Sequence, residues 1–221
     1  MNTILATRLL RVNMVLPPVV AILSLLEQFK KEGLEFAPIT IPVPENAPAD
    51  VPRLILTLNN KIGRIVITGE GIDLDFEKQF WDEQKPFVLL KLIWEKCAQD
   101  CKINRFIYVL QDKIQIENPA QVIYTHLQLT NLKSSAANLD HLAVIYRERM
   151  NLKDVFTLKT TEIISDWDKI IKDTDIPPNI IRFRETFAPR IEPQLKDIEE
   201  IVNIINNQFE TDKQKYVWLC Q

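Results

Sequence analysis

Two short stretches of the chain place arginines at alternating positions, YRER at 146–149 and RFRE at 182–185. The arginines concerned are Arg147, Arg149, Arg182 and Arg184, with Arg190 following shortly after. If both stretches are strands, each pair of guanidinium groups projects from one face of its strand. Guanidinium offers bidentate donors to carboxylate and phosphate, so neighbouring strands would form an anion-binding surface. The alternative is cross-strand pairing with acidic neighbours such as Glu162.

A second candidate site is the stretch TGEGIDLDF at 68–76, which ends in alternating aspartates. In a strand, Asp73, Asp75 and Glu77 share one face, where three carboxylates could hold Mg²⁺ or Mn²⁺. The apolar residues between them also explain the stretch as a half-buried strand with a solvated face, which is the interpretation we favour. No third glycine and no helix follow the two glycines, which argues against a phosphate-binding loop.

The apolar residues around this stretch change parity along the chain. Ile65 and Ile67 occupy odd positions, whereas the apolar residues from Ile72 onward occupy even positions. An unbroken strand would therefore turn its apolar side over halfway along. A β-bulge or a tight turn must reset the register, and Gly69 and Gly71 accept such conformations.

The cysteines and histidines give no convincing catalytic or zinc signature. Cys97 and Cys101 lie four residues apart on the apolar stripe of an expected helix, so we interpret them as small buried hydrophobic residues. A zinc site with His126 and His141 is the alternative. Asp140 could orient His141 as a general base, but no serine lies in a nucleophile elbow. We assign no catalytic residues and no cofactor, and we favour a protein without enzyme activity.

Composition sets broad limits on the kind of protein. The chain has 221 residues and a net charge of −3, and its length allows it to bury a sizeable core. It has only three cysteines, which fits a reducing compartment. A near-neutral charge gives no long-range attraction to polyanions, which would need a local basic patch. The apolar N-terminal run is interrupted by Pro17 and Pro18, unlike a signal peptide. We expect a soluble, cytoplasmic protein that does not bind membranes.

Hydrophobic periodicity predicts the order of elements. Strands are expected at 3–15, 54–58, 65–76, 103–116, 142–150, 155–164 and 180–188, with a final strand in the tail KYVWLCQ. Helices are expected at 18–33, 86–100 and from Pro193, with a short helical or irregular stretch from Pro119 and a polar loop at 129–140. The first hairpin turns at NNKIG, whose asparagines and glycine tolerate positive φ.

This order predicts a single α+β domain at 1–221. It combines a largely antiparallel sheet with three main helices packed on one face. The order of strands followed by one helix recurs in the second part of the chain, which suggests two similar halves at 1–117 and 118–221. Five prolines within 37–52 predict an extended, polyproline-like arm, either a surface strap or a docking arm for a partner.

Several structural motifs occur together along the chain, namely Pro17-Pro18 at a strand end, VPRLIL after the proline-rich arm, the hairpin IVITGEGIDLDF, Trp81 downstream of it, and the C-terminal IEEIVNIINNQFE. In these motifs the chain resembles a sporadically distributed family of functionally uncharacterised bacterial proteins. It departs from the family near Asn203, where members often carry histidine. The resemblance implies the architecture and no activity, and the patchy distribution of the family implies a link to mobile elements or phage defence.

These observations favour a non-catalytic protein-interaction module, such as an adaptor, inhibitor or immunity-type factor of a bacterial or phage conflict system. Its partner would be another protein, with a homodimer as one form. The alternative is an anion, nucleotide or nucleic-acid binding protein, including a metal-dependent phosphodiester enzyme that combines the arginines with the acidic strand face.

Overall fold

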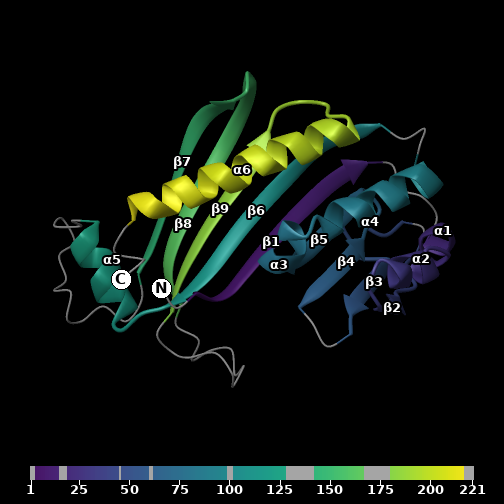
Figure 1. Ribbon diagram of the computed structural model, residues 1–221, viewed down its shortest axis with the longest axis horizontal. Coiled ribbons are helices and arrows are strands. Elements are labelled where there is room, and N and C mark those ends of the chain that lie inside the picture. The colour runs from purple at the N-terminus through teal and green to yellow at the C-terminus, as the bar shows by residue number, and fades with distance from the viewer. Residues whose placement is uncertain are drawn as a thin grey trace.

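The chain forms one nine-stranded antiparallel sheet with helices packed against it, as the computed structural model shows (Figure 1). The structure describes residues 3–14, 19–44, 46–59, 62–98, 102–127, 142–166 and 180–216. The strands are β1 (Thr3–Met14), β2 (Phe36–Thr40), β3 (Leu54–Leu58), β4 (Gly63–Ile67), β5 (Gly71–Glu77), β6 (Ile103–Gln115), β7 (Ala143–Leu152), β8 (Val155–Asp166) and β9 (Ile180–Pro189). The predicted α+β class with an antiparallel sheet is confirmed.

Helices lie between some of these strands along the chain and after the last one. They are α1 (Val19–Leu23), α2 (Leu26–Lys31), α3 (Lys78–Asp82), α4 (Lys85–Ile93), a π-helical turn at Trp94–Ala98, α5 (Pro119–His126) and α6 (Leu195–Lys215). Gln194 and Asp197 form a capping box that fixes the start of α6. Within the described residues, no helix is long and apolar enough to cross a membrane.

The sheet is built outward from two central strands, β1 and β6. The strand order is β2-β3-β4-β5-β1-β6-β9-β8-β7, so each central strand is followed by a meander that returns to pair with it. β5 pairs with β1 on one side, and β9 pairs with β6 on the other. Leu9 of β1 lies opposite Val109 of β6 where the two groups of strands meet.

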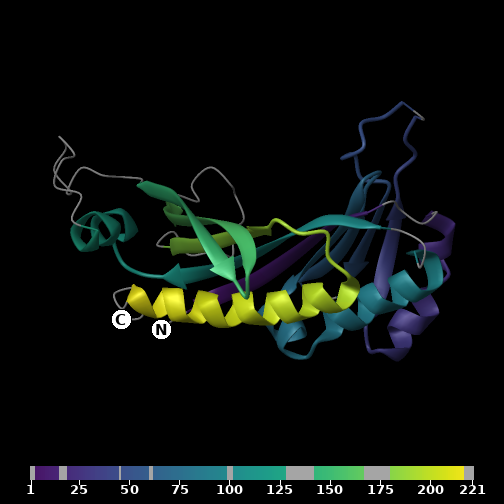
Figure 2. The same ribbon diagram turned by 90° about the horizontal axis from the view of Figure 1, so that it is seen from above.

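One face of the sheet packs against helices on both groups of strands. Tyr108 of β6 contacts the ring of Trp81 in α3 and donates a hydrogen bond to Asn206 of α6. Phe183 of β9 packs on Phe209 of α6 with ring centroids 5.3 Å apart. In Figure 2, α6 and α4 lie along the same side of the sheet. This helix-covered face carries the hydrophobic core.

The stretch TGEG is a tight turn between two separate strands. We expected one strand at 65–76 with a register reset; the structure has β4 and β5, with Ile67 opposite Ile72. A Cβ on Gly71 would lie 2.3 Å from the carbonyl oxygen of Val12, and the Gly69 N–H donates to the Ala49 carbonyl at 2.6 Å. Both glycines allow close backbone approach in this turn.

The first helix and the proline-rich segment differ in detail from their predictions. The helix expected at 18–33 is broken into α1 and α2 around Ser24, whose hydroxyl donates to the Ala21 carbonyl. The arm expected at 37–52 begins as the edge strand β2, which pairs with β3 through Pro38. Proline is tolerated there because an edge strand leaves one side of its backbone unpaired. The expected polar loop at 129–140 and the tail strand lie outside the described residues.

Candidate binding surface

The sheet face opposite α3 and α6 is here called the open face. One row of directly opposite residues crosses it, comprising Ala37, Thr57, Arg64, Asp75, Leu9, Val109, Thr186, Thr160 and Arg147. Large apolar side chains are exposed on it, with Ile39, Ile145 and Phe156 at 55%, 61% and 43% exposure. Exposed apolar groups with interleaved charges are typical of interaction surfaces.

The structure brings the two predicted arginine pairs onto this same open face. Arg184 lies opposite Glu162 on β8, and Arg147 lies opposite Thr160 on the same strand. The strands β7 and β9 are therefore separated by β8, so the pairs flank a strand instead of lying on adjacent ones. Arg149 and Arg182 continue the same face by the period of two.

The arginines differ in how they are neutralised. Arg184 Nη1 lies 3.7 Å from Glu162 Oε2, as the cross-strand alternative predicted, yet its Nε has no hydrogen-bond acceptor among the described residues. Arg147 and Arg149 are exposed, and neither has an ion-pair partner within the described part of the chain. Arg105 and Lys113 of β6 add further cations on this face. This part of the open face therefore has a cationic excess.

The other part of the open face is close to charge balance. Arg11 makes a bidentate contact with Asp73, with Nε and Nη2 at 2.7 and 2.6 Å from its carboxylate oxygens, and this contact raises the pKa of the guanidinium. Arg64 pairs with Asp75 at 3.0 Å. The predicted metal-site residues Asp73, Asp75 and Glu77 do share one face, but two of the three carboxylates are held by arginines. Among described residues, no group of three acidic, histidine or cysteine side chains is placed to hold a metal ion.

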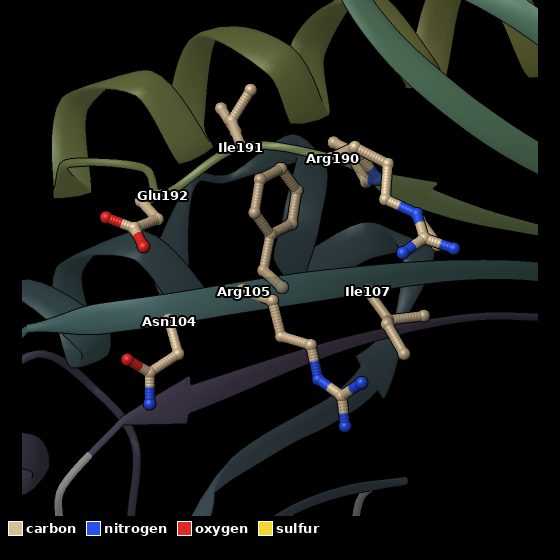
Figure 3. Close-up of a pocket in the computed structure, with 9 residues that line it drawn as sticks. Asn104, Arg105, Ile107, Arg190, Ile191 and Glu192 are labelled. Atoms are coloured by element: carbon tan, nitrogen blue, oxygen red, sulfur yellow. The ribbon is translucent and has the colours of Figure 1, made fainter.

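Arg190 lies apart from the other predicted arginines, at a hollow of about 510 Å³ between the start of β6 and the segment after β9 (Figure 3). Arg105 and Ile107 line this hollow from β6, and Arg190 and Glu192 line it from the other segment. Arg105 Nε donates to Asn13 Oδ1 at 3.3 Å, and Glu192 pairs with Lys102. The hollow extends the cationic part of the open face toward the end of β1.

A second set of charged residues lies buried between the sheet and α6. Arg8 donates to Asp112 at 2.9 Å, and Lys213 of α6 contacts the same carboxylate. Arg8 also stacks over the ring of Phe209, 4.8 Å from its centroid. Beside this group, Lys159 lies 2.5 Å from Asp212 and 3.2 Å from Glu185. These contacts tie α6 to strands from both groups.

The environment of this buried cluster shifts its proton affinities. Burial raises the pKa of Glu185 to about 7, although Lys159 opposes the shift. Burial raises the pKa of Asp212 as well, but hydrogen bonds from Lys159, Lys215 and Gln208 outweigh it and leave the pKa lowered. Glu185 Oε2 has no hydrogen-bond partner among the described residues.

Sequence reasoning missed this buried cluster, although a signal was present. Asp112 follows Tyr108 and Leu110 on the apolar side of β6, and Glu185 lies between Phe183 and Phe187 on β9. A charged residue on the apolar, core-facing side of a strand requires a buried partner. Applied to the sequence, that rule would have identified both residues as members of an internal ion network.

Most of the cysteine and histidine candidates fall on residues that the structure does not describe. The side chain of Cys97 and the residues Cys101, Asp140 and His141 lie outside the described structure, while His126 is exposed at the end of α5.

The chain matches no protein-family model and no curated protein. The resemblance to an uncharacterised bacterial family and its link to phage defence therefore stay predictions.

Proposed function

We propose that this protein is a non-catalytic interaction module that binds another protein through the open face of its sheet. The proposal takes the three main helices as packed on one face of a single domain with two similar halves, so that the other face is left for a partner. The observation that carries it is the set of exposed apolar and cationic side chains on the open face, which includes Ile39, Ile145, Phe156, Arg147 and Arg149. An adaptor, inhibitor or immunity-type factor would act in this way.

The contrast between the two faces supports binding rather than catalysis. Three titratable groups with shifted pKa values, Lys159, Glu185 and Asp212, are buried between the sheet and α6, where they hold the helix to the sheet. On the open face, Asp73 and Asp75 are occupied by arginines. Charged groups there are arranged for complementarity with a partner.

A second candidate function is binding of nucleic acid or another polyanion. It is favoured by the cationic excess around Arg147, Arg149 and Arg184, since phosphate is a natural acceptor for guanidinium. Because Asp73 and Asp75 are held in ion pairs, we propose this candidate as anion binding without phosphodiester chemistry.

Affinity capture from host lysate with paired variants tests the first candidate. Thr186 is half-buried in the centre of the open face, and Asn207 is exposed on α6. We expect the wild type and Asn207→Glu to capture the same protein and Thr186→Glu to lose it, because the new charge lies in the interface. A wild-type protein that is monomeric and captures nothing would remove the main support for the proposal.

A further inference from the structure

The two edges of the sheet differ in their capacity to accept another strand. At one edge, β2 has five residues and contains Pro38. At the other edge (Figure 1), β7 has ten residues, contains no proline and pairs with β8 without a register shift. Long, straight edge strands are templates for pairing with another chain, and short or proline-containing ones are not. β7 is therefore the edge that needs an explanation.

The backbone groups of β7 that face away from the sheet can be assigned from its hydrogen bonds. The Ser165 N–H donates to the Leu142 carbonyl at 2.9 Å, so these opposite residues form a hydrogen-bonded pair. Hydrogen-bonded and non-hydrogen-bonded pairs alternate along an antiparallel ladder. Even-numbered residues of β7 therefore bond to β8, and Ile145, Arg147 and Arg149 direct their N–H and C=O groups outward.

The side chains of these same three residues lie on the open face. Arg147 and Arg149 stand about 7 Å apart along the strand and have no ion-pair partner within the described residues. Ile145 is 61% exposed beside them. Glu148 projects to the helix-covered face, where Lys159 holds it at 2.7 Å. Within the described part of the chain, the edge thus presents two cations without ion-pair partners beside backbone donors and acceptors that pair with no other strand.

A second copy of the chain is a poor match for this edge. Antiparallel pairing of two identical β7 strands needs a two-fold axis perpendicular to the sheet, which keeps open face beside open face. Residues of the same parity then lie opposite one another, and the registers centred on Arg147 or Glu148 place Arg147 opposite Arg147 or Arg149. Like charges directly opposite each other destabilise a strand pair. Self-pairing of β7 in these central registers is therefore disfavoured.

Nucleic acid matches the charges of this edge but not its backbone. Phosphate oxygens accept hydrogen bonds and would leave the outward carbonyls of Ile145, Arg147 and Arg149 without donors. A peptide backbone supplies both donors and acceptors at strand spacing. The occupant that satisfies both the charges and the backbone is an extended acidic peptide.

We propose that β7 accepts an extended segment of another protein, with acidic residues at alternate positions, as an added strand of the sheet. The inference rests on the proposed interaction function and specifies its partner chemistry. The acidic side chains of the segment lie on the open face against Arg147 and Arg149, and its backbone pairs with the outward groups of β7.

A labelled β-prone peptide with glutamate alternating with threonine and valine tests the proposal by fluorescence anisotropy. Ile145→Pro removes one outward N–H and no bond to β8, and should weaken binding at least about tenfold. Arg147→Glu/Arg149→Glu should weaken it by a similar factor and should gain binding of the matching lysine peptide. Lys31→Glu/Lys196→Glu, which makes the same charge change on exposed helix residues, should leave binding unchanged.

Several outcomes would overturn the edge assignment, provided circular dichroism shows that the variants are folded. The first is that the wild type does not bind the glutamate peptide at about 1 mM. The second is that Ile145→Pro binds the peptide as tightly as the wild type does. The third is that the wild type binds oligodeoxythymidine more tightly than the peptide. Dimerisation of the wild type that Ile145→Pro abolishes would point to a second copy instead. If Thr186→Glu loses the captured partner while Ile145→Pro keeps it, the edge assignment fails and the proposed function stands.

Discussion

Arg8 and Asp112 form an ion pair of 2.9 Å beneath α6, with side chains that are only 1% and 2% exposed. The two residues come from the two central strands, and Lys213 of α6 contacts the same carboxylate. A charge buried to this extent depends on its partners, because an uncompensated ion in the interior is very costly. The pair therefore joins the two groups of strands and the helix that covers them.

Removal of the Asp112 carboxylate should destabilise the protein strongly. Asp112→Ala leaves Arg8 and Lys213 buried without their acceptor, and we expect a loss of about 3 to 5 kcal/mol in the free energy of unfolding. Urea denaturation measures it. The matched control is Asp73→Ala, which removes the partner of Arg11 on the open face and should cost about 1 kcal/mol or less. Equal losses in the two variants would contradict the structural role of the buried pair.

Stability should fall as the pH rises from about 5 to about 8 because of Glu185. Its pKa is raised from 4.5 to about 7, so between these values the folded state binds a proton that the unfolded state has released. The stability that Glu185 contributes is fully present below its pKa in the unfolded state, and it is lost as the pH rises through its pKa in the folded state. Its size is about 3 kcal/mol at 1.36 kcal/mol per pKa unit.

Glu185→Gln should flatten this part of the pH profile, since the amide does not titrate. The exposed Glu200, which pairs with Lys153, offers a control in Glu200→Gln, whose profile should follow that of the wild type. Urea midpoints at several pH values provide the measurement. A wild-type stability that rises steadily from pH 5 to 8 would refute the assignment of a protonated Glu185.

The turn between β4 and β5 should not tolerate a side chain at its second glycine. Gly71→Ala places a Cβ 2.3 Å from the Val12 carbonyl oxygen, a backbone atom that cannot move away easily. We expect a loss of about 2 to 3 kcal/mol in thermal or urea unfolding. Gly33→Ala is a useful comparison, because its Cβ would meet nothing within 4 Å and only its φ of +79° is unfavourable. That substitution should cost about 1 kcal/mol.

The second candidate function makes a separate prediction for the arginines of β9. Arg182→Glu/Arg184→Glu should lower the affinity for a single-stranded oligonucleotide and reduce the salt dependence of binding, because phosphate contacts release counterions. Anisotropy titrations at several salt concentrations measure both. Lys31→Glu/Lys196→Glu serves again as the charge-matched control. If reversal of the two arginines left both quantities unchanged, the polyanion candidate would be abandoned.

Much of the local structure was predictable from the chain alone. The alternation along 103–116 defined β6, and the apolar stripe from Leu195 to Phe209 defined α6. The parity change at Gly69 and Gly71 correctly required an interruption, which the structure resolves as a turn between β4 and β5. Cross-strand pairing of the candidate arginines with Glu162 was also among the predictions, and Arg184 makes this pair.

The sequence by itself determined which side chains share a face of each strand and each helix, because those directions follow from backbone periods of 2.0 and 3.6 residues. Only the tertiary structure decided which strands became neighbours. That choice depends on contacts between distant segments, such as Asp112 with Lys213 or Arg11 with Asp73, which no local period encodes. The strand order paired Asp73 and Asp75 with arginines of neighbouring strands. It also buried Asp112 and Glu185, which lie on the apolar side of their strands, under α6. Arg147 and Arg149 came to lie on the edge strand β7.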